Sequence, residues 1–204
     1  MNDRLEEIEK YSPYGGDLIL EEVKGTDNVF ITAENSVTTS QGCDRTMYSY
    51  IPKNGCPDAK QCQVLMVLRN EATKESAEKL MHELKLDTLA EERHFILLFP
   101  NPTEKGWNYM EDKEAENDLA FLVRCFAVLP KSKGGVAGFN GMIFYIGTTP
   151  ESSALLQRQS LRNPLDTSAI MVGKFPENFS LSEKAHPQTA WIYDNNTKYG
   201  DYLK

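Results

Sequence analysis

The sequence has little of what metal centres, membrane spans and exported domains usually need. It contains three histidines, and its four cysteines show neither C-x-x-C spacing nor a histidine at metal-site spacing. No apolar run approaches the length of about 18 residues that a membrane-spanning helix needs, and the first residues lack the apolar core of a signal peptide. We therefore expect no metal, no other cofactor and no membrane association. We expect a soluble cytoplasmic protein, unless the sequence was cut from that of an exported one.

An excess of positive charge is also missing. Acidic residues outnumber basic ones by 30 to 22, and the formal net charge of −8 argues against nucleic acid as a partner. The length of 204 residues and the ordinary balance of apolar and charged residues suit one globular domain with a sizeable core. We therefore treat residues 1–204 as a single domain.

Three of the four cysteines allow an expectation about their chemical state. Cys125 lies in the apolar, helix-like run 121–129 and is expected to be a core residue. Cys56 and Cys62 flank a Pro-Asp turn, and a disulfide between them in an oxidising compartment and two free thiols both remain open.

Two further patterns carry no site in this interpretation. Acidic residues alternate with other residues at a helix entrance, where we expect a solvated first turn and not a cation site: Asp112, Glu114, Glu116 and Asp118. The glycines at 134, 135 and 138 lead into a strand, the reverse of a phosphate-binding loop, so residues 131–140 are expected to form a flexible connection.

The pattern of strands and helices predicts the fold class. Residues 18–23 and 29–33 read as strands of an antiparallel hairpin across the turn 24–28. Further strands are expected at 45–52, 64–68, 95–100, 142–146, 167–172 and 189–193, with helices at 71–84, 118–129 and from 151 onward. Strands that alternate with helices predict a three-layer α/β/α sandwich around a mostly parallel sheet, preceded by the antiparallel N-terminal hairpin.

The stretch from Gly147 to Glu151 follows one of these strands and opens a helix. Strand, tight turn and helix form the nucleophile elbow of hydrolases, whose pattern is G-x-S-x-G. Here Thr149 takes the place of the serine, and Pro150 takes the place of the residue whose N–H normally holds the oxyanion. The loss of one such donor lowers turnover by roughly 10²–10³-fold. Thr149 is therefore a weak catalytic candidate, and a helix cap is the simpler role.

Four further stretches, in this order, carry a family resemblance: Tyr48–Pro52, Glu75–Leu80 with Leu89–Pro100, Gly106–Asn108 and Glu116–Leu122. With them, the chain resembles the esterase and polyhydroxybutyrate-depolymerase-like branch of the α/β-hydrolases. The resemblance implies an α/β-hydrolase fold with its core at residues 45–195, residues 1–44 as an N-terminal extension, and ester hydrolysis by a Ser-His-Asp triad.

The departures from this family fall on its catalytic parts. Arg69 and Asn70 stand where such esterases usually carry a His-Gly pair. The family's acid and histidine follow the strand at 189–193, but no histidine lies beyond His186 here. His82 lies in a helix and His94 precedes a strand at the end of the sheet opposite the elbow, so both are expected to be structural.

Residues that follow the carboxyl ends of parallel strands should meet at one edge of the sheet. We expect a binding cleft there, lined by Arg69, Asn70, Trp107, Thr149 and Glu151. Such a cleft would suit a small molecule or a peptide, through a carboxylate, a sugar or a peptide end. An equally open alternative is that Arg69 pairs with Glu151 and closes the vestigial cleft.

The main hypothesis is a non-catalytic or strongly impaired hydrolase-like domain that acts as a binding or structural module. One alternative is an ester hydrolase that uses Thr149, Ser152 or Ser153 as nucleophile, with His186 or a residue of another chain as base. Another is the N-terminal part of a longer esterase. If the sheet ends near Tyr193, we expect a homodimer through that edge strand.

Overall fold

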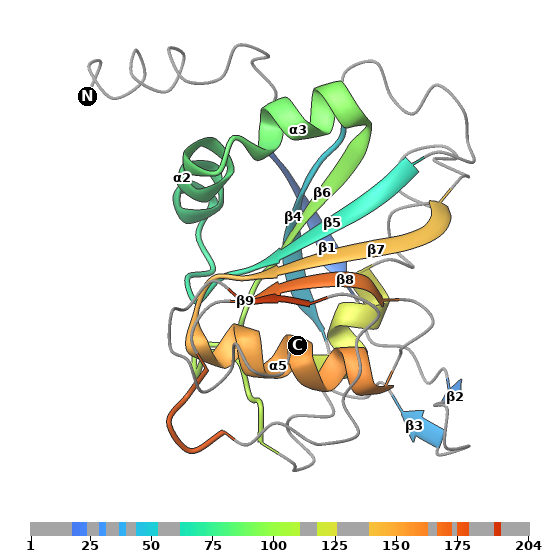
Figure 1. The fold of residues 1–204 in the computed structure, drawn as a ribbon, viewed down its shortest axis with the longest axis vertical. Coiled ribbons are helices and arrows are strands. Elements are labelled where there is room, and N and C mark those ends of the chain that lie inside the picture. Colours follow the sequence, from blue (N-terminus) through green and yellow to red (C-terminus); the bar gives the residue numbers. More distant parts are fainter. Residues whose placement is uncertain are drawn as a thin grey trace.

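The fold of the chain is taken from a computed structural model (Figure 1). It describes residues 18–23, 29–31, 37–39, 44–52, 62–110, 118–125, 139–162, 167–172, 175–179 and 190–192. The predicted lead at 1–12, the connection at 131–138 and His186 lie outside these residues.

A mixed sheet of seven strands forms the centre of the molecule, in the order β1-β4-β6-β5-β7-β8-β9. Its strands are β1 (Ile19–Val23), β4 (Arg45–Tyr50), β5 (Cys62–Leu68), β6 (Phe95–Pro100), β7 (Phe139–Gly147), β8 (Thr167–Val172) and β9 (Ala190–Ile192). The strands from β6 across β5, β7 and β8 to β9 are parallel, while β1 and β4 run antiparallel to their neighbours.

The N-terminal part is antiparallel, as the sequence predicts. The short strands β2 (Val29–Ile31) and β3 (Val37–Thr39) pair with each other in a separate two-stranded sheet. Strand β1 pairs with β4, where the sequence suggested the strand at 29–33 as its partner. The partner of β1 is a strand distant in the sequence, and the residues of a local turn do not indicate such a pairing.

Helices cover both faces of the sheet, as Figure 1 shows. Helices α2 (Lys74–Glu83) and α3 (Leu86–Arg93) connect β5 to β6 on one face, while α5 (Pro150–Arg162) and the helical residues 118–125 cover the other. Because β6 and β8 lie on opposite sides of the β5–β7 pair, right-handed crossovers must place their helices on opposite faces.

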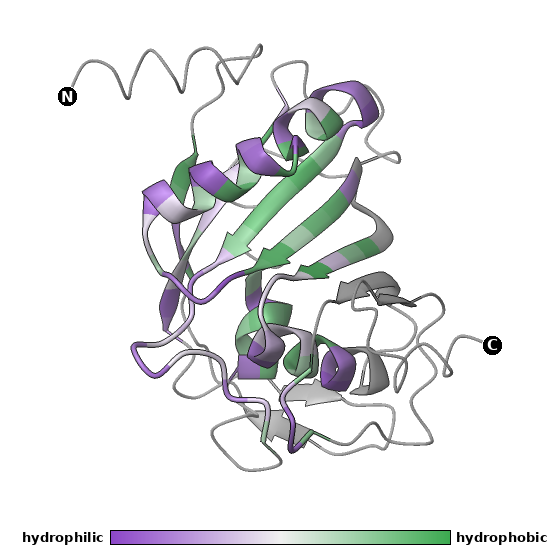
Figure 2. Cartoon of the chain, turned by 60° about the vertical axis from the view of Figure 1, so that its left-hand side comes forward, coloured by the Kyte–Doolittle hydropathy of each residue, from purple (hydrophilic) through white to green (hydrophobic). Residues whose placement is uncertain are grey.

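The core has two layers because neighbouring residues of a strand point to opposite faces. In β6, Leu97 packs with residues of α2 and α3, whereas Leu98 packs with residues 118–125 and α5. Both leucines are fully buried, and Figure 2 shows the strands as a continuous hydrophobic layer between helices with polar outer faces. The predicted three-layer α/β/α architecture is thus confirmed.

Helix α3 was not predicted from the sequence. It follows α2 after only two residues. The residue before its first turn is Lys85, whose left-handed φ of 53° turns the chain and whose side chain makes no capping hydrogen bond. Its apolar positions show little helical periodicity, so the usual signal is weak. Strand β7 also begins three residues before the predicted start at 142, within the stretch expected to be a connection.

Candidate functional site

The elbow predicted from the sequence is present. Strand β7 ends at Gly147, a turn of two residues follows, and α5 begins at Pro150. A side chain at Gly147 would place its Cβ 3.0 Å from the backbone of Ser153, so glycine allows the strand and the helix to approach. Thr148 fixes the turn to β5, because its N–H and its hydroxyl both donate to the carbonyl of Leu68.

Thr149 is the N-cap of α5. Its Oγ1 accepts from the N–H of Ser152 at 3.3 Å, and the Oγ of Ser152 accepts from the N–H of Thr149 at 3.0 Å. This is the reciprocal arrangement of a capping box, with serine in the place of the usual glutamate. Pro150 is then the first helical residue, a position that proline favours because no intrahelical partner exists for that N–H.

Thr149, Asn70 and Glu151 form one hydrogen-bonded cluster at the carboxyl edge of the sheet. The hydroxyl of Thr149 donates to Oδ1 of Asn70 at 2.8 Å, and Nδ2 of Asn70 donates to the carboxylate of Glu151 at 3.2 Å. The pKa of Glu151 lies below its ordinary value, chiefly because its own backbone N–H donates to the carboxylate, with further bonds from Asn70 and Thr149. The cluster therefore presents a carboxylate that is ionised at neutral pH.

Arg69 lies next to this cluster in the sequence but points into the protein, with 3% of its surface exposed. Its guanidinium donates to the side chains of Ser76 and Asn101 and to the carbonyls of Thr73 and Pro100. Burial lowers its pKa from the ordinary value to about 10. Its side chain is thus committed to the fold, and Glu151 bonds to Asn70 in place of the proposed pairing with Arg69.

Trp107 is also a buried residue, with 4% of its surface exposed. Its indole N–H donates to the carbonyl of Arg69 at 2.7 Å, and its ring stacks on Phe121. Of the five residues expected around the cleft, the structure brings three side chains together, those of Asn70, Thr149 and Glu151. The side chains of Arg69 and Trp107 are buried instead, and the indole of Trp107 bonds to the backbone of Arg69.

The two described histidines lie away from Thr149. His82, in the last turn of α2, faces Asp87 with Nδ1 3.5 Å from a carboxylate oxygen, and His94 ends α3 before β6 begins. Helix α2 starts after the carboxyl end of β5 and runs back, so both histidines lie toward the amino ends of the parallel strands. Neither supplies a base to the elbow.

Two other expectations concern Cys125 and Asp118. Cys125 is a buried core residue, as predicted. The prediction of a solvated Asp118 is wrong: this carboxylate is buried, forms an ion pair with Arg45 and accepts from the N–H of Asn108. Asp118 can be buried because Arg45, which is distant in the sequence, pairs with its charge. The other three acidic residues of that stretch, and the side chains of Cys56 and Cys62, lie outside the described residues.

The role of Ser152 was missed by sequence reasoning, which considered it only as an alternative nucleophile. Ser152 and Ser153 are both fully buried in the first turn of α5. The spacing of Thr149 and Ser152 is that of a capping box, and this signal was available in the sequence.

Within the described part of the chain, no helix is long and apolar enough to cross a membrane.

Neither a protein-family model nor a curated protein sequence matches the chain. Solved structures do match. A serine hydrolase without lid from Xanthomonas campestris aligns with a TM-score of 0.53 at 11% identity, over 92% of this chain and 78% of that one. An acetyl xylan esterase from Aspergillus awamori aligns with a TM-score of 0.50 at 13% identity, over 80% of this chain and 57% of the esterase.

The protein has the α/β-hydrolase fold. A poly(3-hydroxybutyrate) depolymerase from Bordetella parapertussis also aligns, with a TM-score of 0.47 at 11% identity, over 69% of this chain and 53% of the depolymerase. The chain thus spans little more than half the length of the Aspergillus and Bordetella proteins. At such low identity the likeness extends to the α/β-hydrolase fold and not to an activity.

Proposed function

We propose that the chain is a non-catalytic α/β-hydrolase-like domain that acts as a binding or structural module. One observation carries the proposal: the hydroxyl at the elbow caps α5 and donates to Asn70, with no histidine of the described residues beside it. A hydrolase needs a base within hydrogen-bond reach of that oxygen. The residue after Thr149 is a proline, so the oxyanion would also lack its usual N–H donor.

The ligand of such a module would bind at the cluster of Asn70, Thr149 and Glu151. The ionised carboxylate of Glu151 and the exposed amide of Asn70 suit a small molecule or a peptide that offers hydrogen-bond donors or a positive charge. This chemistry differs from the carboxylate ligand considered from the sequence, because Arg69 bonds inside the protein.

The alternative is an ester hydrolase with an atypical nucleophile. It is favoured by one observation, that Thr149 is partly exposed at the tip of an intact elbow. His186 or a longer polypeptide would then have to supply the base. Ser152 and Ser153 fit this role less well, since both are fully buried.

The test compares hydrolysis of p-nitrophenyl acetate by the wild type, Thr149→Ala and Thr149→Ser. We expect all three to match the buffer rate. Thr149→Ala should also lose about 1 kcal/mol of stability, because it removes the N-cap, while Thr149→Ser should keep the cap. Turnover that vanishes in Thr149→Ala, or labelling of Thr149, Ser152 or Ser153 by a fluorophosphonate, would establish the hydrolase instead.

A further inference from the structure

We propose that the cluster of Asn70, Thr149 and Glu151 binds a protonated primary amine and excludes anions. The inference rests on the proposed function, because it names the ligand class of that binding module. Asn70 is exposed and the other two residues are partly exposed, so all three have surface in contact with solvent. The start of a helix commonly binds anions through its free N–H groups, and α5 departs from this rule.

Among the described residues 149–153, no N–H group at the start of α5 is left for an anion. The N–H of Thr149 donates to Oγ of Ser152 at 3.0 Å, and the N–H of Ser152 donates to Oγ1 of Thr149. The N–H of Glu151 donates to its own carboxylate, and that of Ser153 donates to the carbonyl of Thr149 at 2.9 Å. Pro150 has no N–H. A carboxylate or phosphate would therefore have to break a hydrogen bond of the helix start in order to bind there.

The polar atoms that remain at this place are mainly oxygen acceptors. The carboxylate of Glu151 is ionised at neutral pH, since its pKa is lowered, and no basic side chain in the described part of the chain pairs with it. Oδ1 of Asn70 accepts one hydrogen bond, from the hydroxyl of Thr149, while a carbonyl oxygen can accept two. The cluster thus holds a negative charge, and next to it an acceptor, without a cation of the described chain.

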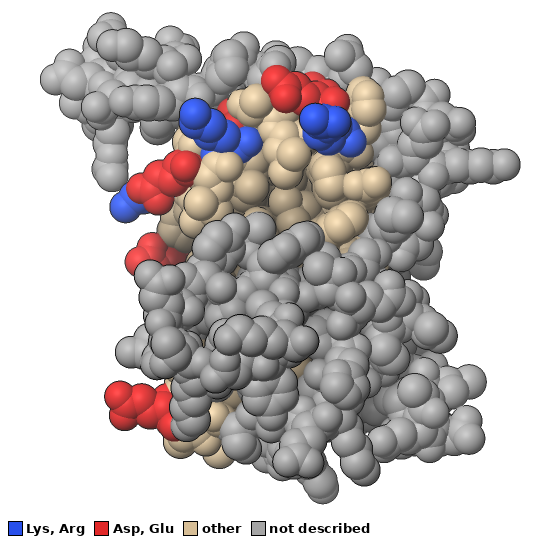
Figure 3. All heavy atoms as spheres, in the orientation of Figure 1, with Lys and Arg blue, Asp and Glu red and all other residues tan. Residues whose placement is uncertain are grey.

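The surroundings of the cluster add negative charge. Glu71 follows Asn70 directly and is exposed. Figure 3 shows mostly acidic atoms among the charged side chains along its left margin, the side on which α2 and α5 begin in Figure 1. Lys74, the first residue of α2, is already paired with Glu78 at 3.3 Å. The electrostatic potential at this edge of the sheet therefore attracts a cation and repels an anion.

The hydrogen bonds of Glu151 favour an amine over a guanidinium. Oε2 of Glu151 already accepts from Nδ2 of Asn70 at 3.2 Å, whereas a guanidinium binds a carboxylate best through both oxygens at once. A primary ammonium is a compact charge with three donors. One of its N–H groups can bond to the carboxylate while another bonds to Oδ1 of Asn70, because a hydrogen bond already joins these two side chains. The ligand class that fits these acceptors is thus a protonated primary amine.

The experiment follows the amide resonances of the ¹⁵N-labelled chain by NMR during titration with n-butylammonium chloride, at neutral pH and constant ionic strength. We expect saturable shifts at residues 70, 149 and 151, and a dissociation constant that rises at least about threefold in Glu151→Gln, in line with an exposed ion pair. Asn70→Ala removes the second acceptor and should weaken binding in the same direction. Methylguanidinium should bind more weakly than the amine, and butyrate should cause no saturable shift. Circular dichroism checks the fold of each variant.

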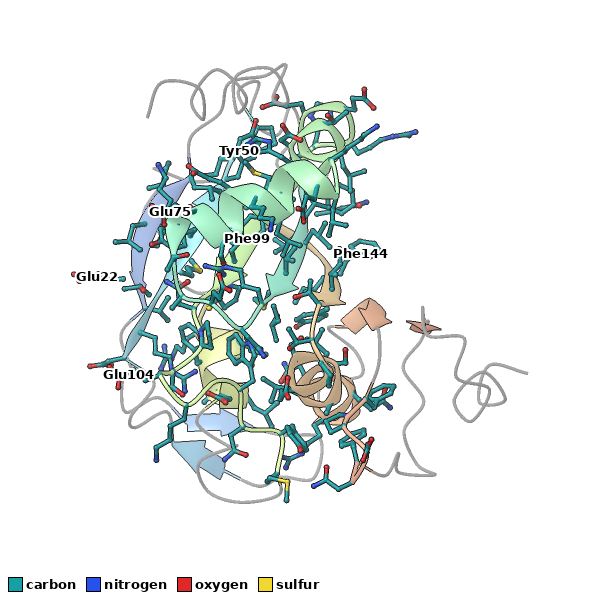
Figure 4. The ribbon with its side chains drawn as sticks, turned by 90° about the vertical axis from the view of Figure 1, so that its left-hand side faces the viewer. Glu22, Tyr50, Glu75, Phe99, Glu104 and Phe144 are labelled. Carbon is teal, nitrogen blue, oxygen red and sulfur yellow. The ribbon has the colours of Figure 1, made fainter. Side chains whose placement is uncertain are left out.

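Glu75→Gln is the matched control. Glu75 is an exposed carboxylate in the first turn of α2, and Figure 4, a view onto this edge of the sheet, shows it to the left of α5 and apart from it. Its replacement should leave the dissociation constant unchanged.

Three results would overturn the inference: no saturable shift with the amine, equal binding of the amine by the wild type and Glu151→Gln, or saturable binding of butyrate at the same residues. Each of them would leave the proposed function standing as long as p-nitrophenyl acetate is not turned over. Turnover that depends on Thr149 would overturn the proposed function instead, and the amine titration would still report the ligand class of the cluster.

Discussion

Arg69 shows how a single residue can resemble a ligand-binding group and serve the fold. It follows a central strand at the edge where ligands gather, yet its guanidinium joins the end of β6, the start of α2 and Asn101. Asn101 in turn donates to the hydroxyl of Thr46 in β4. The ring faces of Tyr48 and Phe99 lie within 6 Å of the cation. The residue thus connects three strands and a helix.

We predict that Arg69→Met lowers the free energy of unfolding by about 2–4 kcal/mol, since buried carbonyl and side-chain acceptors lose their donors. Urea denaturation would measure the change. Lys79→Met, at an exposed ion pair on α2, is the control and should stay within about 0.5 kcal/mol of the wild type. An equal, small effect of both substitutions would contradict the role given to Arg69.

Glu151 gives a prediction for pH. Its pKa in the folded protein lies below the ordinary value of 4.5, so the ionised form is favoured by folding. The stability that it contributes is complete above pH 4.5 and is lost as the pH falls through the lower, folded pKa. The urea midpoints of the wild type and Glu151→Gln should therefore differ near neutral pH and converge in acid. A difference that does not change with pH would show that the carboxylate has no such linkage.

At the scale of elements, the contact between β7 and α5 depends on Gly147. The strand ends against the backbone of Ser153, and the close approach lets Thr149 cap the helix while Thr148 bonds to β5. The same geometry would present a nucleophile in an active hydrolase. Here it fixes the start of α5.

We expect Gly147→Ala to destabilise the protein by about 1–3 kcal/mol, because the added methyl group meets backbone atoms that cannot rotate away. Thermal unfolding would detect the loss. Ser153→Ala is an informative companion: it removes the hydroxyl that would lie 3.1 Å from the added methyl group but leaves the backbone contacts. If the double variant Gly147→Ala/Ser153→Ala recovered the full stability of the wild type, the added methyl group would be obstructed by the hydroxyl of Ser153 and not by its backbone.

At the scale of the molecule, the sheet separates two apolar layers. Neighbouring residues of one strand belong to different layers, which distinguishes this architecture from a sheet with one solvated face. Truncation of a side chain on either side of the middle of β6 should therefore destabilise the protein.

Leu97→Ala and Leu98→Ala should each cost about 2–5 kcal/mol, since each leaves a cavity in a different layer. Chemical denaturation of both variants is the measurement, with Leu20→Ala at the exposed edge as the control. A large effect at only one of the two leucines would mean that the other face is open to water.

Local signals in the sequence were enough to predict the order of most strands and helices, the fold class and the elbow. These signals are continuous apolar runs, helical spacing, and glycine and proline at a turn. The roles of the individual side chains came from the folded chain, which pairs β1 with β4, buries Asp118 against Arg45, and directs the side chains of Arg69 and Trp107 inward. The hydrogen bond from the hydroxyl of Thr149 to Asn70 also became visible only there. The direction and the partner of a side chain depend on residues distant in the chain, and a local pattern does not contain them.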